Sequence, residues 1–206
     1  RTLKKYKARY IVTPHGGYNT IAMQKNAWVK KIYFQLFERK VLQAAYKIHC
    51  IGQSETTGLT SIFTNNKSYL LPYGFETQNP ALQLSNDGDK FIIGFVGRLD
   101  IYTKGLDLLI KAFSAFAKEV PQTELWILGD SDERATLESL IVNQGLSDKI
   151  ILFGSKFGQE KDQIMAKMHV FVHPSYNTWL SESVLLSSRL GQACIASRVA
   201  NIVQTI

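Results

Sequence analysis

Short apolar runs alternate with amphipathic stretches along most of this chain. The run Phe91–Val96 is rich in β-branched and aromatic residues, which is typical of a strand buried on both faces. From residue 106 to 117 apolar residues recur every three or four positions, whereas Lys111 and Lys118 fall on the other side. This spacing predicts a helix with one buried face. A strand, a glycine-bearing loop and a helix form a βα unit of a parallel sheet.

The same alternation continues to the end of the chain. After the first strand, 91–97, the pattern predicts helices at 105–119, 132–143, 160–167 and 182–190, and strands at 125–128, 150–153, 170–172 and 193–196. Upstream it predicts strands at 10–13, 47–52 and 68–71, a long helix over 20–45 and a shorter one over 54–63. The fold class is therefore α/β, with doubly wound, parallel, Rossmann-like sheets.

A polar stretch that contains proline and glycine divides the pattern. Residues 76–89 are expected to form an interdomain linker between part of an amino-terminal α/β domain, 1–75, and a carboxyl-terminal Rossmann-like domain, 90–206. The chain starts at Arg1 and stops soon after a predicted strand. Both domains are therefore expected to be truncated, and the closing helices of the second to be absent.

Composition excludes several classes of protein. The chain has 206 residues, 45% of them hydrophobic, so it is long enough to bury one large core or two smaller ones. No apolar run approaches the length of a membrane span, and no secretory signal is visible. Its two cysteines, Cys50 and Cys194, lie far apart in apolar surroundings, which argues against a disulfide framework or a zinc cluster. A reducing cytoplasm fits best.

The positive charge of the chain is confined to its first quarter. Residues 1–50 contain eleven Lys or Arg and a single acid, Glu38, whereas the rest of the chain is slightly acidic. Such asymmetry points to an anionic partner. Residues 25–40 combine aromatic and basic side chains as a peripheral helix on the inner membrane leaflet would. The alternative is an aromatic core face with a solvated basic face. No recognition motif supports nucleic-acid binding.

Two cations flank the loop after the strand 91–97. Arg98 and Lys104 stand between this strand and the following helix. Ligands of open α/β sheets bind at the carboxyl ends of the strands, where helix N-termini also favour anions. The two cations therefore suit a diphosphate.

Several motifs along the chain, in order, resemble glycosyltransferase family 4, the group 1 retaining enzymes of the GT-B type. They are Gly97-Arg98-Leu99 with Lys104-Gly105-Leu106, then Leu128-Gly129-Asp130, then 151–154, 170–175 and 191–197, preceded by Pro14-His15-Gly16, Ser54-Glu55 and 71–74. The resemblance covers almost the whole chain. It implies transfer of a sugar from a nucleotide sugar to a polysaccharide or glycolipid acceptor, with retention, in the biosynthesis of cell-surface glycans.

The resemblance also implies roles for individual residues. Arg98 and Lys104 would stabilise the leaving diphosphate without a metal ion or other cofactor, and His15 would line the reacting sugar. The acceptor, a glycan or a lipid-linked molecule, would bind mainly to the amino-terminal domain. The donor-binding residues expected from the motifs are Gly97, Arg98, Lys104, Gly154, Ser155, Thr178, Leu180, Ser181, Glu182 and Ser183. His169 and His173 are spaced like metal ligands, but they bracket an apolar strand and a metal site is not expected.

The chain departs from the family pattern at two carboxylates. Thr178 and Trp179 stand where family members usually carry Glu-Gly, and Leu186 stands where they carry a second glutamate. Three hypotheses follow. The chain is a transferase with altered donor contacts, a non-catalytic homologue that binds a partner glycosyltransferase or a glycan, or an unrelated nucleotide-binding domain.

Overall fold

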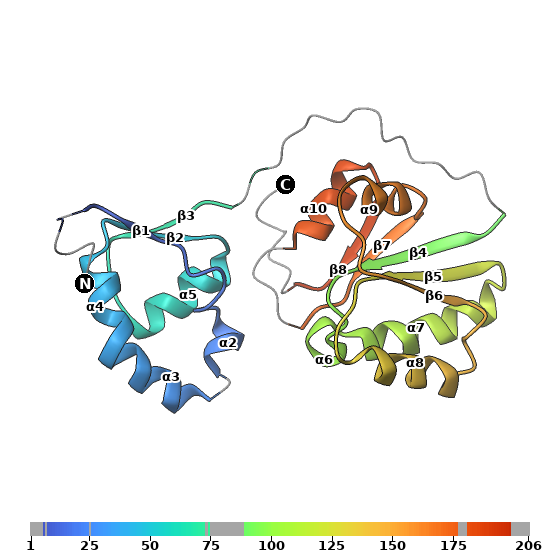
Figure 1. Ribbon diagram of the computed structural model, residues 1–206, viewed down its shortest axis with the longest axis horizontal. Coiled ribbons are helices and arrows are strands. Elements are labelled where there is room, and N and C mark those ends of the chain that lie inside the picture. The colour runs from blue at the N-terminus through green and yellow to red at the C-terminus, as the bar shows by residue number, and fades with distance from the viewer. Residues whose placement is uncertain are drawn as a thin grey trace. The chain divides into compact units, whose positions relative to one another are not determined.

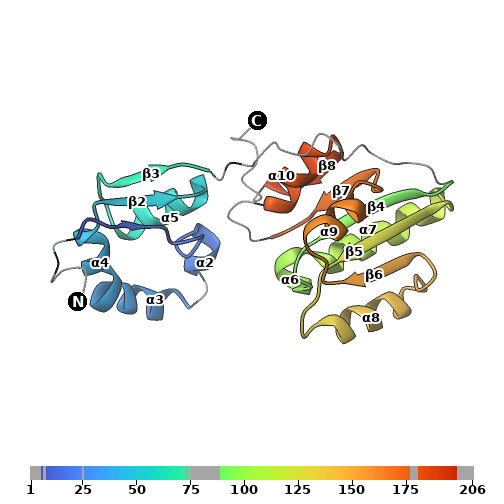
Figure 2. The same ribbon diagram turned by 45° about the horizontal axis from the view of Figure 1, so that its top comes forward.

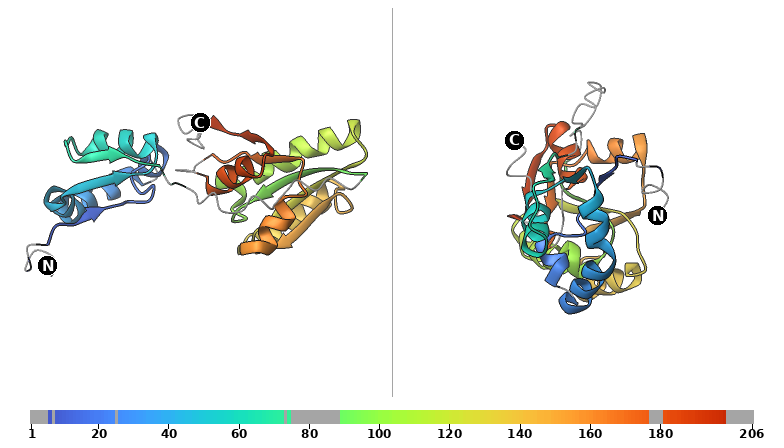
Figure 3. Two further views of the ribbon diagram at one scale, coloured as in Figure 1. Left: turned by 90° about the horizontal axis from the view of Figure 1, so that it is seen from above. Right: turned by 90° about the vertical axis from the view of Figure 1, so that its left-hand side faces the viewer.

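Two α/β units make up the described part of the protein. The computed structural model describes residues 6, 8–24, 26–72, 74, 89–176 and 181–198, one unit lying within 6–74 and the other within 89–198 (Figure 1). Residues 76–88 of the expected linker lie outside the described residues. The path of the chain within each unit can be followed from further sides in Figures 2 and 3.

The first unit is built on a small parallel sheet. Its strands lie in the order β1-β2-β3, and its core contains Tyr18, Phe34, Leu42, Ile48, Cys50 and Leu59. The elements are β1 (Ile11–Val12), α2 (Thr20–Gln24), α3 (Ala27–Tyr33), η1 (Phe34–Glu38), α4 (Arg39–Ala44), β2 (Lys47–Cys50), α5 (Gln53–Ile62) and β3 (Ser68–Leu70). The parallel strands agree with the predicted fold class.

The expected single helix over 20–45 is wrong. Asn26 adopts a left-handed conformation with φ of 55°, which ends the first helical segment, because asparagine tolerates this region better than most residues. A π-helical turn, η1, then separates α3 from α4. No residue of α3 is buried, whereas Phe34 of η1 and Leu42 of α4 enter the core. The segment therefore touches the core at few points.

The second unit is a doubly wound sheet of five parallel strands in the order β6-β5-β4-β7-β8. Figure 1 shows α6, α7 and α8 on one face of this sheet and α9 and α10 on the other. This arrangement confirms the predicted α/β class. The elements are β4 (Phe91–Val96), α6 (Ile101–Lys104), α7 (Leu106–Glu119), β5 (Thr123–Leu128), α8 (Arg134–Asn143), β6 (Ile150–Gly154), α9 (Gly158–Met165), β7 (Val170–His173), α10 (Glu182–Arg189) and β8 (Ala193–Ala196).

The apolar face predicted for the helix after β4 is confirmed. Lys111 and Lys118 are exposed, and Phe116 is only half-buried. The face packs against the central strands in one core, to which α7 contributes Leu106, Leu109, Ile110, Phe113 and Ala117. Burial of this face stabilises the helix more than its intrinsic propensity does.

The bounds of that helix agree with the predicted 105–119 to within one residue, but a short helix that was not predicted precedes it. Residues 101–104 form the short helix α6, and Gly105 then turns the chain into α7 with a φ of 66°. A Cβ atom at Gly105 would lie 2.4 Å from the carbonyl oxygen of Pro174, so the residue after β7 lies against this turn. Lys104 thus ends a short helix, and the long helix follows Gly105. Among the described residues, no helix is long and apolar enough to cross a membrane.

Candidate functional site

The strand order of the second unit reverses direction at β4. The chain leaves β4 toward β5 and β6 on one side, and β7 and β8 extend the sheet on the other. Ligands of open α/β sheets bind outside the carboxyl ends of the strands, where the strand order reverses. The turns after β4, β5, β6 and β7 all start at this end of the sheet, where the carboxyl ends of the parallel strands lie.

The turn after β4 carries the two cations that the sequence singled out. Arg98 Nη2 lies 3.1 Å from Asp100 Oδ2, and Asp100 Oδ1 accepts a hydrogen bond from the Thr103 backbone N–H at 3.0 Å. The second bond caps the N-terminus of α6 and shapes the turn. Arg98 keeps 68% of its side-chain surface exposed, so most of its N–H donors remain open to a ligand.

Lys104 is half-buried, whereas Arg98 is exposed. Burial lowers the pKa of its ammonium group, the charge of Arg98 lowers it further, and Asp100 acts in the opposite direction. The turn therefore holds two mutually repelling cations with one carboxylate close to both. A bound anion would relieve this repulsion, which is the electrostatic signature of a phosphate site.

Close contact between backbones holds the turn against the neighbouring strand. Gly129 follows β5 with a φ of 143°, and a Cβ atom there would lie 1.8 Å from the carbonyl oxygen of Gly97. The Gly97 N–H donates to Leu128 O at 2.9 Å, and the Gly129 N–H donates to Gly154 O at 2.9 Å. Three successive strand ends are thereby fixed side by side.

A cavity of about 330 Å³ opens at these strand ends. It brings Gly97, Arg98 and Ser155 together, as the site prediction requires, and Gly154 lies directly beside it. Lys104 does not line this cavity. Residues outside the predicted donor site also line it, namely Val96, Leu128, Gly129, Asp130, Lys156, Phe157 and Lys161. Lys156 and Phe157 could have been found from their position just after a parallel strand, whereas Lys161 lies within α9 and has no such signal.

The start of α10 contributes differently from the expectation. Ser181 is buried, and its hydroxyl accepts a hydrogen bond from the Val184 N–H at 3.4 Å, so it serves as the cap of this helix. Glu182 is exposed and Ser183 is half-buried, and none of the three lines the cavity. Thr178 and Leu180 lie outside the described residues. Leu186 is buried on the inner side of α10.

His15 occupies a turn of the first unit. It is exposed, and its φ of 51° places it in the left-handed region that few side chains adopt. The buried carboxylate of Glu55 accepts hydrogen bonds from Gly16 N at 2.6 Å and from Ile51 N at 3.1 Å. Glu55 therefore ties the His15 turn to the end of β2. The structure describes the two units separately, so His15 is not placed relative to Arg98 and Lys104.

The two histidines near β7 lie in different surroundings. His169 directly precedes the strand and His173 ends it, and His169 Nδ1 accepts a hydrogen bond from the Ile92 N–H at 3.0 Å. In the part of the chain that the structure describes, no group of three His, Cys, Asp or Glu side chains could hold a metal ion.

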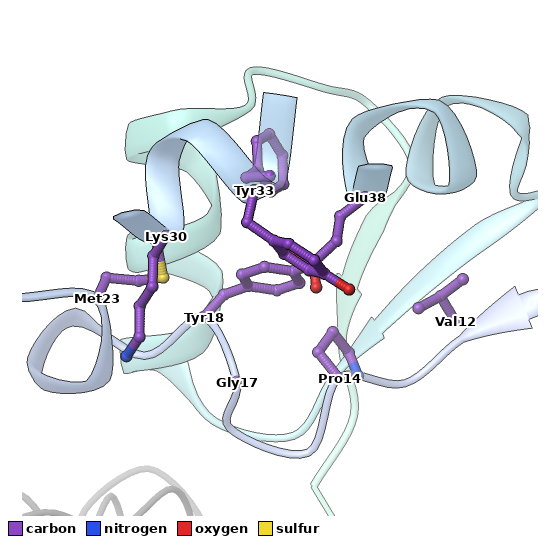
Figure 4. A pocket seen from close by; sticks show the side chains of 9 residues that line it. Val12, Pro14, Gly17, Tyr18, Met23, Lys30, Tyr33 and Glu38 are labelled. Carbon is purple, nitrogen blue, oxygen red and sulfur yellow. The ribbon is translucent and has the colours of Figure 1, made fainter. Parts of the chain in front are cut away.

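A second cavity, of about 450 Å³, lies in the first unit near the end of β1 (Figure 4). The Tyr18 hydroxyl donates to Glu38 Oε2 at 2.7 Å. Burial, followed by the bond to Glu38, raises the pKa of Tyr18 well above its ordinary value. Figure 4 shows Tyr18, Tyr33 and Glu38 around this cavity, with Lys30 and Met23 further along its wall. The lining combines the aromatic side chains of Tyr18, Tyr33 and Phe34 with aliphatic residues and with the charged Lys30 and Glu38.

A comparison with models of protein families shows the family of this chain. The model of the glycosyl transferases group 1 matches residues 79–206, which is more than half of the chain. The chain belongs to this family. Its matched part contains the whole of the described second unit, including the turn after β4.

Curated relatives of this glycosyltransferase are distant in sequence. The phosphatidylinositol N-acetylglucosaminyltransferase gpi3 subunit of Schizosaccharomyces pombe is 23% identical over 160 residues, which cover 76% of this chain and 35% of that protein. The 2-deoxystreptamine glucosyltransferase of Streptomyces kanamyceticus is 26% identical over 115 residues, which cover 56% of this chain and 30% of that protein. The chain thus spans about a third of the length of these relatives.

Solved structures resemble the chain over nearly all of its length. Anabaena Alr3699/HepE, solved in complex with UDP and glucose, matches with a TM-score of 0.79 and 16% identity, covering 99% of this chain and 56% of that one. WaaG, a glycosyltransferase involved in lipopolysaccharide biosynthesis, matches with a TM-score of 0.72 and 16% identity, covering 100% and 64%. These likenesses show the GT-B fold.

Proposed function

We propose that this chain carries the donor-binding part of a family 4 glycosyltransferase, which moves a sugar from a nucleotide sugar to a glycan or lipid-linked acceptor with retention of configuration. The observation that carries the proposal is the pair Arg98 and Lys104, held with surplus positive charge after the carboxyl end of β4. The adjacent cavity, with Ser155 and Phe157, has room for the nucleoside part. UDP in the complex of Alr3699/HepE agrees with such a ligand.

The proposed role of this site is to stabilise the diphosphate as it leaves the sugar. As the bond from the sugar to the diphosphate breaks, negative charge grows on the phosphate oxygens. Arg98 and Lys104 neutralise that charge through N–H donors fixed before the reaction begins. Two fixed cations can do this without a metal ion or another cofactor. His15 is proposed to line the reacting sugar from the first unit.

A specific departure favours a second candidate function. Leu186 stands where the family carries a glutamate, and its buried apolar side chain offers no hydrogen bond to a ribose. Losing such a bond weakens donor binding by about 1–3 kcal/mol. A non-catalytic homologue that serves as a partner subunit would tolerate this loss. The gpi3 relative is itself named as a subunit.

The acceptor is proposed to be part of a cell-surface glycan or a glycolipid, met at the cytoplasmic face of a membrane. α3 and η1 expose Trp28, Ile32, Leu36 and Phe37, and the basic residues Lys31, Arg39 and Lys40 are exposed beside them. Apolar and basic side chains together suit an anionic interface. The names of two relatives, which mention phosphatidylinositol and lipopolysaccharide core, agree with a lipid-linked acceptor.

Calorimetric titration tests the donor site. The chain is titrated with a panel of UDP-, GDP- and ADP-sugars, and one of them is expected to bind. Changing Arg98 or Lys104 to Ala should weaken that binding by roughly 10- to 100-fold, the range for a hydrogen bond to a charged group. Lys111→Ala is the matched control, because Lys111 is exposed on α7. Binding with no turnover by the full-length protein would favour the partner subunit, and no binding at all would overturn the donor site.

Sedimentation with lipid vesicles tests the membrane surface. The chain should pellet with vesicles that contain phosphatidylserine and stay in solution with pure phosphatidylcholine, and added salt should release it. Replacing Lys31, Arg39 and Lys40 with Gln should reduce pelleting. The same replacement at Lys111, Lys118 and Lys167, which are exposed on the second unit, removes equal charge and serves as the control. Equal losses in both triple variants would contradict a local membrane surface.

A further inference from the structure

His173 is a buried histidine whose two ring nitrogens form no hydrogen bond with any described residue. It is the last residue of β7, with only 2% of its surface exposed. Its ring lies nearly parallel to those of Phe95 and Phe171, with centroids 6.3 and 6.5 Å away. Phenylalanine would fill this place without leaving two polar atoms unpaired, so packing alone does not explain a histidine.

The segment that follows His173 is tied to both sides of Lys104. The Ser175 hydroxyl and the Tyr176 N–H both donate to Thr103 O, at 3.0 and 2.9 Å. On the other side of Lys104, Gly105 packs on the carbonyl oxygen of Pro174. The end of β7 and the turn that carries Lys104 are therefore fixed to each other by contacts with the backbone on either side of the lysine.

The electrostatics of the two side chains are complementary. Burial, and then the charge of Lys104, lower the pKa of His173 to about 4, so the ring is neutral at physiological pH. Lys104 is the only charged group that acts on this ring among the described residues. A neutral imidazole has one nitrogen that accepts a hydrogen bond, and an ammonium group has three N–H donors.

We propose that His173 is a positioning residue for Lys104. The structure itself contains no bond between the two side chains. When a nucleotide binds, a rotation of the lysine side chain lets a His173 ring nitrogen accept a hydrogen bond from the ammonium and hold it toward the diphosphate. This inference rests on the proposed donor site. The bond would favour the charged form of the lysine, against the burial and the repulsion by Arg98 that oppose it. It would also give one of the two unpaired ring nitrogens a partner.

The test is calorimetry with UDP, GDP and ADP on the intact chain and on His173→Phe. The diphosphate that binds wild type is expected to bind this variant about tenfold more weakly. The melting temperature should stay level or rise, because phenylalanine removes the unpaired nitrogens. The corresponding nucleoside, which lacks the diphosphate, should bind both proteins equally. Equal diphosphate affinity in the two proteins, or an equal loss for the nucleoside, would overturn the inference.

His169→Phe is the matched control, since it makes the same change at the residue directly before β7. It should lower the melting temperature, because the Ile92 N–H loses its acceptor, and should leave diphosphate affinity unchanged. His173→Asn and His173→Gln each supply an amide oxygen, and at least one of them should restore part of the affinity. Failure of both would contradict the proposed bond even if His173→Phe did not fold.

Two further outcomes separate the inference from the proposed function. If wild type binds a diphosphate and Lys104→Ala weakens it, while His173→Phe does not, only the role of His173 fails. If wild type binds none of the three diphosphates, the donor site itself fails and the inference falls with it. In protein labelled with ¹⁵N-histidine, the diphosphate should shift a ring nitrogen signal that is absent from His173→Phe.

Discussion

Each unit places a candidate residue on a turn that follows a parallel strand, but the two turns use charge in opposite ways. In the first unit the charge is the buried carboxylate of Glu55, and its two oxygens accept from Gly16 N and Ile51 N. In the second unit the charges are Arg98 and Lys104, held by close backbone contact, with Asp100 beside both and Asp130 lining the same cavity as Arg98.

The carboxylate of Glu55 shapes its turn, whereas Arg98 and Lys104 are suited to bind an anionic ligand. Glu55 is fully buried, and its bonds to the backbone compensate its loss of water. Arg98 and Lys104 keep N–H donors that the described residues do not use up, and a bound anion would reduce the repulsion between the two cations. Substitutions can therefore test each turn by its stability and its binding separately.

Gly129→Ala should have the largest effect. A Cβ atom at this residue would meet the Gly97 carbonyl oxygen at 1.8 Å, and its φ of 143° is unfavourable for alanine. We expect a loss of about 3 kcal/mol or more in the free energy of unfolding, measured by urea denaturation. Gly145→Ala is the control, because it also has a positive φ but open space around it, and should cost about 1 kcal/mol. Equal losses would show that the backbone contact does not hold the second turn.

Glu55→Ala should come next and should act on the first unit. It leaves the N–H groups of Gly16 and Ile51 without their acceptor, which should cost about 3 kcal/mol of unfolding free energy. Glu55→Gln keeps one acceptor oxygen and should cost less. Calorimetry on the intact chain would measure both. A loss in Glu55→Gln as large as that in Glu55→Ala would mean that the charge matters more than the acceptors.

Asp100→Asn should have a smaller effect, and one that depends on pH. Burial raises the pKa of Asp100, but the hydrogen bonds with Thr103 and the charges of Arg98 and Lys104 outweigh it, so the pKa in the folded protein lies below the ordinary 3.8. The ionised group thus stabilises the fold above about pH 4 and loses this contribution as pH falls through the lowered pKa.

Urea midpoints measured from pH 7 to 2 would test this account. Asn retains the cap, so Asp100→Asn should cost about 1 kcal/mol or less at pH 7. The difference from wild type should shrink in acid, because wild type then loses the same charge. A difference that stays constant across this range would assign the effect to the shape of the cap and not to charge.

Lys104→Met should have the smallest effect on stability, and with the opposite sign. It removes a partly buried cation that Arg98 repels, and the unfolding free energy should rise by less than about 1 kcal/mol. Nucleotide binding should fall in the same variant. Lys111→Met, on the exposed side of α7, should change neither quantity. A clear loss of stability in Lys104→Met would place the lysine among the structural residues of the turn.

The sequence predicted those features that depend on neighbours along the chain. The hydrophobic pattern alone located the strand Phe91–Val96 and the apolar face of α7, although only Gly94 and Phe95 of the strand are fully buried. The same reasoning failed for the helix over 20–45, where a left-handed Asn26 and a π-helical turn interrupt a continuous helical pattern. Few residues of this segment reach the core, so packing does not hold it to one continuous helix.

Pairing between distant segments decided the rest. Only the strand order brings the residue after β7 against Gly105, and only the register of β5 and β6 brings Lys156 and Phe157 beside Arg98. Glu55 meets Gly16 across 39 positions, which no local pattern reveals. The sequence by itself therefore determined the alternation of elements and the two cations after β4, since these follow from local burial. The tertiary structure decided which groups surround them, because strand pairing depends on contacts across the whole unit.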